Sequence, residues 1–202
     1  MNDLVPATMH SLVNTQKTTQ KDNVVFGDQA AHDVIKNTTY NIQGASVSTE
    51  LGRLIEKYKK EFENNIQFYE QIDKLQHYST PLSEEKIVGL EAKLNAGQRP
   101  QYLPFAIQTK EIFVKKLAKY QFYEAAQEIH AYLLAEIYTR YNLHVYPQIH
   151  CGTQESEINS LIQLKIIDPI LALFNENILH IYADDINGML YFLTGNCHIK
   201  WI

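Results

Sequence analysis

The chain has 202 residues, of which 45 % are apolar and 20 % charged, values that fit one compact globular domain or one domain with an appended segment. A formal charge of −5 argues against general attraction to nucleic acid or anionic lipid, and two cysteines make no disulfide framework. The start MNDLVPATMH has neither a basic stretch nor an apolar run. We therefore expect no signal peptide and a cytoplasmic protein without membrane spans.

Residues 1–45 are expected to form a separate, polar segment that is rich in Thr, Asn and Gln. Short apolar bursts near Phe26 and Val34 alternate with turn formers, which fits either a flexible tail or very short β-strands. Such strands cannot bury an apolar face alone, so order here would require self-association or a partner. We expect this segment to be flexible or to act as an assembly element, and the protein to form a homo-oligomer.

Residues 46–202 are expected to form a mainly α, compact multi-helix domain. Apolar side chains at three- and four-residue steps over 51–75 predict one long helix that ends near His77. The turn around Pro81 precedes a short helix that we expect from Ser83 to Gly97.

The apolar pattern continues over 104–141, where it predicts either one bent helix or two helices with a break near 119–122. The stretch 144–149 is expected to be an extended linker. The next helix covers 155–174, and Pro169 should kink or restart it because proline removes an interior hydrogen bond.

The last helix is expected to begin at Ala183 and to stop at Gly195, after which an apolar, extended terminus carries the only tryptophan, Trp201. Because chain termini are usually polar and frayed, a terminus this apolar is either buried in its own domain or docked into a partner. The pattern favours neither outcome.

Reactive residues are few and widely spaced. The doublets His150-Cys151 and Cys197-His198 supply zinc-type ligands, but they lack the spacing typical of zinc sites. Cys197 with His198 or His130 would form a thiolate–imidazolium pair, so a small Cys/His-dependent hydrolase or nuclease is the alternative function. Glycine-rich phosphate-binding loops are absent from the sequence, and a nucleic-acid-binding module is a third alternative that the acidic balance disfavours.

Four stretches resemble a known family: KLQHYSTP (74–81), GLEAKL (89–94), AQEIHAYLL (126–134) and, most specifically, the ending GMLYFLTGNCHIKW (188–201). Over about 48–202 the chain resembles the C-terminal domain of effector proteins from bacterial three-component conflict systems built around an ABC ATPase. The residues that carry this resemblance include His77, Tyr78, Pro81, Gln127, His130, Gly188, Gly195 and Cys197.

The resemblance implies a non-enzymatic adaptor, without catalytic, cofactor-binding or metal-binding residues, that acts in defence against phage or other invading DNA. Its expected partners are the ABC-type ATPase, a small middle component and other copies of itself. Contacts with partners are expected at aromatic and polar side chains near the C-terminus: Tyr191, Phe192, Asn196, His198 and Trp201.

Overall fold

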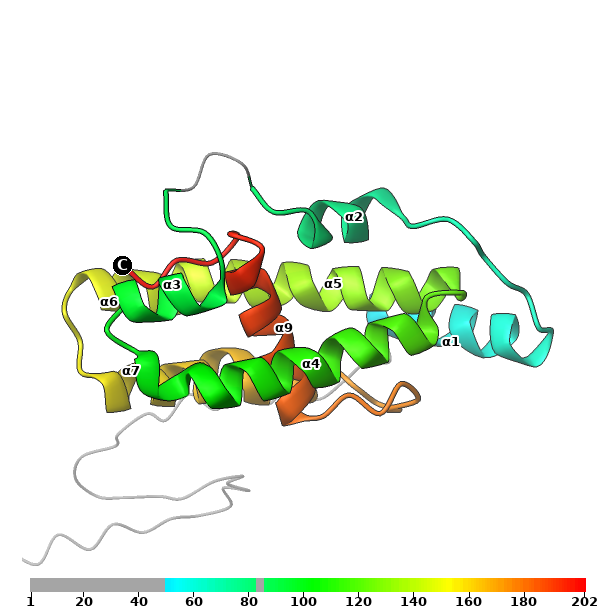
Figure 1. Cartoon of the computed structure of the whole chain (residues 1–202). Helices are drawn as coiled ribbons and strands as arrows, with labels where there is room; N and C mark the ends of the chain where they lie inside the picture. Colours follow the sequence, from blue (N-terminus) through cyan, green and yellow to red (C-terminus); the bar gives the residue numbers. More distant parts are fainter. Residues whose placement is uncertain (1–49, 83–85) are drawn as a thin grey trace, which may run out of the picture. The chain divides into compact units, whose positions relative to one another are not determined.

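The computed structural model describes residues 50–82 and 86–202, all of which belong to the unit Gly44–Ile202 (Figure 1). These residues form helices and connecting turns, and the described part contains no strand. The prediction of a mainly α domain is thus confirmed. The expected segment 1–45, the domain boundary beside it and Ser83 lie outside the described residues. The helix expected from Ser83 to Gly97 is too long, because residues 86–89 are not helical and the helix begins at Leu90, after the positive φ of Gly89.

The predicted single helix over 51–77 is wrong, because α1 (Glu50–Glu63) and α2 (Asp73–Ser79) are separate helices. The chain leaves α1 and changes direction at Asn65, which has a positive φ of 50°. The N–H of Ile66 donates to the carbonyl of Glu61 (2.8 Å) and that of Asn65 to the carbonyl of Phe62 (3.2 Å). This is a Schellman motif, a helix end in which a left-handed residue lets the last carbonyls find donors.

Helix α5 (Glu124–Arg140) lies at the centre of the domain and contacts α1, α2, α4 and α9. Its apolar residues, including Ala125, Ile129 and Leu133, are fully buried around most of its circumference, as is typical of a helix that has neighbours on several sides. The first turn of α5 is capped from a distance, because the buried carboxylate of Glu61 accepts the N–H of Ala125 at 3.0 Å. This hydrogen bond links the end of α1 to the start of α5.

Helices α4 (Leu103–Tyr120) and α9 (Ala183–Gly195) form the most extensive helix pair of the domain. Figure 1 shows α9 crossing the long helices α4 and α5 on its way to the C-terminal end. Gly188 permits the close approach, since a Cβ there would lie 2.3 Å from the carbonyl oxygen of Thr109. The predicted break at 119–122 between α4 and α5 and the predicted helix end at Gly195 are both confirmed.

The expected extended linker at 144–149 is wrong, because this stretch is helical. The π-helical turn Tyr141–Val145 leads directly into α6 (Tyr146–His150), which carries Pro147 in its first turn. A proline ring clashes with the carbonyl four residues earlier, and the wider π turn gives that carbonyl room. The helix therefore continues through Pro147.

The same arrangement recurs beyond α7 (Glu155–Ile162), where the π-helical turn Gln163–Ile167 precedes α8 (Asp168–Leu171). Pro169 lies in the first turn of α8, but the helical path runs without a break from Glu155 to Leu171, so the predicted alternative of a restart at this proline is wrong. The short helix α3 (Leu90–Ala96) and the 3₁₀ turn Pro100–Tyr102 connect α2 to α4. Within the described ranges, every helix falls short of the length and apolar character that crossing a bilayer requires.

Candidate interaction site at the C-terminal segment

The C-terminal segment, residues 196–202, begins with a sharp reversal at the end of α9. Cys197 has a positive φ of 69°, and the N–H of His198 donates to the carbonyl of Leu193 at 2.9 Å. The N–H of Cys197 donates to the carbonyl of Thr194 at 3.1 Å, which completes a Schellman motif. This reversal turns the segment back over the domain, so that Tyr141 donates its hydroxyl to the carbonyl of Lys200 at 2.6 Å.

Trp201 is enclosed by its own domain and is only 3 % exposed. Its indole N–H donates to the hydroxyl of Thr194 (3.2 Å), and the ring of Tyr141 meets it edge-on with centroids 5.4 Å apart. The guanidinium of Arg99 lies over the indole, 5.1 Å from the ring centroid, where a cation–π attraction stabilises the pair. A Cβ at Gly97 would lie 2.6 Å from the Cβ of Trp201, so glycine is required beside it.

His198 forms a second contact, between the C-terminal segment and α2. Its ring lies 5.1 Å from that of His77 and 5.4 Å from that of Tyr78. Asn196 donates its side-chain N–H to the carbonyl of Tyr78 at 3.0 Å, and its own carbonyl accepts the N–H of Leu82 at 3.2 Å. Burial lowers the pKa of His198, and the His77 ring lowers it further, so the neutral imidazole is favoured here.

Four of the five predicted contact residues therefore lie in the core of the domain. Tyr191, Phe192, His198 and Trp201 are all buried, with at most 7 % exposure, and Asn196 is half-buried. Of the two outcomes that the sequence allowed for this terminus, the structure shows burial in its own domain. The contact of these five residues with a partner stays a prediction.

The residues that carried the resemblance fall into two groups: those where α2 meets the end of α9, and those inside the domain. His77, Tyr78, Asn196 and His198 meet at the corner between α2 and α9, and the exposed Pro81 lies just before Leu82 at its edge. The remaining members hold packing or backbone positions, as shown above for Gly188 and Cys197. A Cβ at Gly195 would meet the flexible end of Lys110.

Gln127 is a buried hydrogen-bonding hub on α5. Its side-chain amide donates to the carbonyls of Glu70 (2.8 Å) and Gln121 (2.7 Å), and its oxygen accepts the N–H of Ile72 at 3.0 Å. These bonds hold the irregular stretch 64–72 against α5. Gln127 therefore supplies hydrogen-bond partners to three partly buried bonds with the backbone.

His130, one turn further along α5, is completely buried. Its Nδ1 lies 2.7 Å from the carbonyl of Ala126, and the ring lies beside those of Phe113 and Tyr120. Burial lowers its pKa to about 4, so the ring is neutral near pH 7 and donates from Nδ1. Its Nε2 has no hydrogen-bond partner within the described part of the chain.

The residues considered for zinc or for nucleophilic catalysis do not form one cluster. Cys151 is exposed at the end of α6, whereas Cys197 is buried at the end of α9. His130 and His198 have different ring neighbours and thus different surroundings. Among residues 50–82 and 86–202, no three His, Cys, Asp or Glu side chains gather in a way that could hold a metal ion.

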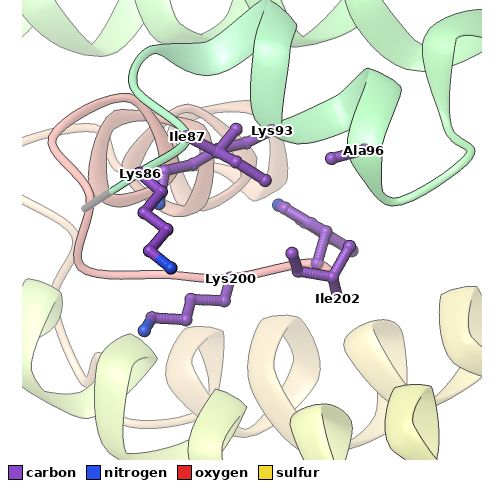
Figure 2. Close-up of a pocket in the computed structure, with 7 residues that line it drawn as sticks. Lys86, Ile87, Lys93, Ala96, Lys200 and Ile202 are labelled. Atoms are coloured by element: carbon purple, nitrogen blue, oxygen red, sulfur yellow. The ribbon is translucent and has the colours of Figure 1, made fainter.

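A pocket of about 340 Å³ opens beside the C-terminal segment (Figure 2). It combines apolar walls with three lysines, and we call it the lysine pocket; its lining residues are Lys86, Ile87, Lys93, Ala96, Lys200, Trp201 and Ile202. Lys93 is buried and donates to the carbonyl of Ile199 at 3.4 Å. Lys86 and Lys200 are exposed at its edge.

Sequence reasoning missed this pocket, because its residues come from two stretches that are about 100 residues apart in the chain. Lys86 and Lys93 lie in the stretch between α2 and α4, whereas Lys200 lies in the C-terminal segment. Their approach to Lys200 depends on the reversal at Cys197, which has no sequence signature because cysteine is uncommon in the left-handed region.

In its described part, the fold defines a helical domain whose C-terminal segment completes its own core and borders a basic, apolar pocket. A family model described as C-terminal domain 9 of the ABC-three component (ABC-3C) systems matches residues 89–201, which is more than half of the chain. The chain belongs to this family. The match runs from the residue before α3 to Trp201 and thus includes most of the lysine pocket. No curated protein and no solved structure matches the chain.

Proposed function

We propose that the chain is a non-enzymatic adaptor of an ABC-three component system. It holds an ABC-type ATPase and a small middle component in one assembly, and the assembly acts against phage or other invading DNA. The observation that carries this proposal is the family match over 89–201. A component of a multi-protein system has to recognise its partners, and an adaptor does so without chemistry of its own.

The surroundings of the reactive groups support the adaptor reading over the hydrolase alternative. His130 is enclosed by aromatic rings, and Cys197 sits at a backbone reversal. Asp185 is 1 % exposed and is 2.5 Å from the ammonium group of Lys116. Its carboxylate also accepts the N–H of Tyr182 at 2.8 Å, at the start of α9. Aromatic packing, a backbone turn and an ion pair account for the positions of these three groups.

Exposed apolar side chains on α4 supply a surface for protein contact. Ile107 and Val114 are seven residues apart, which places them on the same face of the helix, and they are 53 % and 41 % exposed. Tyr69 and Phe122 continue the apolar surface near the end of α4, with ring centroids 5.7 Å apart. Surfaces of this kind are common at contacts between protein subunits.

Co-expression with the components encoded beside this gene tests the proposal. The tagged full chain should retain the ATPase and the middle component through affinity and size-exclusion steps. Replacing both Ile107→Glu and Val114→Glu should weaken retention, whereas the matched change Leu164→Glu, at a side chain 61 % exposed elsewhere, should not. A full chain that elutes alone contradicts the adaptor proposal.

The variants Cys197→Ala and His198→Ala separate the adaptor from a hydrolase or nuclease. If chemistry at these residues mattered, both variants would abolish protection against phage while still folding and retaining partners. We expect protection to follow partner retention instead, so thermal unfolding and retention are measured on the same preparations. Loss of protection with unchanged stability and retention would favour the enzyme.

A further inference from the structure

Arg99 is a buried cation that pairs with no carboxylate in the described part of the chain. Its side chain is only 7 % exposed, whereas a buried charge in a protein is normally paired with an opposite one. The guanidinium lies over the ring of Trp201, 5.1 Å from the centroid, and it makes neither a side-chain hydrogen bond nor an ion pair with another described residue. Its N–H donors therefore stay available to a ligand.

One acidic residue, Glu155, lies close enough to interact with the charge of Arg99, but it is bound elsewhere. Its carboxylate accepts the hydroxyl of Tyr102 and the side-chain N–H of Gln101, the latter at 2.7 Å. These two hydrogen bonds, and to a smaller degree the charge of Arg99, lower the pKa of Glu155. Glu155 makes no ion pair with Arg99, so it does not neutralise the guanidinium at contact distance.

The guanidinium of Arg99 borders a pocket of about 420 Å³, which we call the arginine pocket. The pocket lies where two turns meet, one after α3 with Gln98 at a φ of 57° and one after α6 with Gly152 at a φ of 72°. None of the described residues that line it is acidic. The nitrogens of Arg99 are not among the fully buried polar atoms that lack a partner, which indicates that they open to the pocket. A ligand here meets a positive charge that no described carboxylate occupies.

Polar and apolar groups surround this charge in the arginine pocket. Gln98 contributes a side-chain amide and His150 an imidazole, and both side chains are exposed. The ring of Tyr146 meets the imidazole edge-on, with centroids 4.5 Å apart, and this contact helps to position it. Ile149 and Trp201 supply apolar surface. The pocket thus offers several hydrogen-bond donors beside an apolar wall.

A phosphate monoester fits this set of groups better than a carboxylate does. The guanidinium fork pairs with two oxygens of a phosphate at once, and a further oxygen remains for His150 or Gln98. A carboxylate has no oxygen left once it has paired with the fork. The volume of about 420 Å³ exceeds the size of a single phosphate group and lies within the roughly 300–1,000 Å³ of small-molecule sites. The ligand should therefore carry an organic part as well.

We propose that the arginine pocket binds a small organic molecule through its phosphate monoester group. The guanidinium of Arg99 holds the phosphate, and His150 and Gln98 contact the remaining oxygen. The organic part packs against Ile149 and Trp201. This ligand site goes beyond the adaptor function and does not depend on it, because it involves neither the exposed face of α4 nor a partner protein.

Isothermal titration calorimetry of the full chain with phenyl phosphate tests the proposal. Phenylacetate and benzyl alcohol keep the ring but replace the phosphate, and inorganic phosphate lacks the ring. We expect saturable binding of phenyl phosphate and at least about tenfold weaker binding of the other three probes. Trp201 lines the pocket and is the only tryptophan in the chain, so its emission should follow the same binding curve. Absence of binding, or equal binding of phenyl phosphate and any other probe, overturns the proposal.

Variants of two lining residues place the binding in the arginine pocket. Arg99→Lys keeps the positive charge but removes the planar fork, and it should weaken binding of phenyl phosphate about tenfold or more. His150→Ala should weaken binding about threefold to fivefold with an unchanged unfolding temperature, because this side chain is exposed. The matched change His144→Ala, at an exposed histidine outside the pocket, should leave binding unchanged.

The histidine variants decide the matter if Arg99→Lys does not fold. Equal binding of phenyl phosphate by the His150→Ala and His144→Ala proteins contradicts the site. Equal binding by the parent and a folded Arg99→Lys protein also contradicts it.

Discussion

Two irregular segments of the domain, 64–72 and 196–202, start in the same way and end differently. Each follows a helix that closes with a Schellman motif, and each uses a left-handed residue other than glycine, Asn65 or Cys197. The first segment leaves Ile66 and Tyr69 exposed by 55 % and 77 %. The second buries Trp201 to 3 % exposure.

The comparison shows that irregular backbone can serve as core or as surface, depending on what its side chains meet. The first segment is held mainly through its backbone, by Gln127 and by the N–H of Phe68, which donates to the carbonyl of Phe122 at 2.8 Å. The second is held by an aromatic side chain inside a cage. Partner contacts should therefore be sought at exposed side chains, not at the buried indole.

The largest difference between the two segments is expected for truncation of their aromatic residues. Trp201→Ala should lower the free energy of unfolding by about 4 kcal/mol, because it empties a closed cage. Tyr69→Ala should change it by no more than about 0.5 kcal/mol, because that ring is largely in solvent. Urea unfolding followed by circular dichroism measures both, and equal effects would contradict the comparison.

A smaller loss is expected where α9, which carries the C-terminal segment, crosses α4. Gly188→Ala should destabilise the domain by about 3 kcal/mol, because its Cβ would clash with backbone at Thr109. Gly195→Ala is the matched control, since its Cβ would meet only the movable end of Lys110. The two variants should differ clearly in the midpoint of thermal unfolding. Similar midpoints would show that α9 and α4 have room for a Cβ at Gly188.

Removal of the hub on α5 should affect the segment 64–72 selectively. Gln127→Leu leaves the N–H of Ile72 and the carbonyls of Glu70 and Gln121 without partners, at a cost of about 2–3 kcal/mol. Limited proteolysis should then cut within 64–72 earlier than in the parent, while 196–202 stays protected. Cleavage that increases first at the C-terminus would show that the two segments are coupled.

The smallest expected effect is the dependence of the free energy of unfolding on pH, which arises from the buried His130 on α5. His130 has a pKa of about 4 in the folded domain and about 6.5 when unfolded, so the unfolded chain binds more protons between these values. Its contribution is fully present above pH 6.5 and is lost as the pH falls toward 4, by about 2 kcal/mol between pH 7 and pH 5. His130→Met should flatten this part of the stability profile, and an unchanged slope would contradict the assignment.

Much of the helical framework could be predicted because it depends on local pattern. The break at 119–122 and the stop at Gly195 both follow from apolar spacing and from the backbone properties of glycine. The left-handed turn at Asn65 was missed, because the apolar pattern of α1 and α2 continues in register across it. The π turn before Pro147 was missed because proline usually ends a helix, and only tertiary packing makes the wider turn favourable.

The site was less predictable than the framework for a different physical reason. The apolar ending identified Trp201 as an anchor, but the sequence cannot show whether the cage around an anchor comes from the same chain. The cage residues Arg99, Tyr141 and Thr194 come from three separate stretches of the chain. The lysine pocket likewise forms only when two distant stretches meet, so its charge is invisible to any local pattern.

The central claim is that the C-terminal segment completes the core of its own domain before any partner binds. The emission and acrylamide quenching of Trp201 in the isolated full chain test this claim directly, because no other tryptophan contributes. The account predicts blue-shifted emission and weak quenching that become those of free tryptophan only upon unfolding. Red-shifted, readily quenched emission from the folded chain alone would show that the indole lies in solvent and would contradict it.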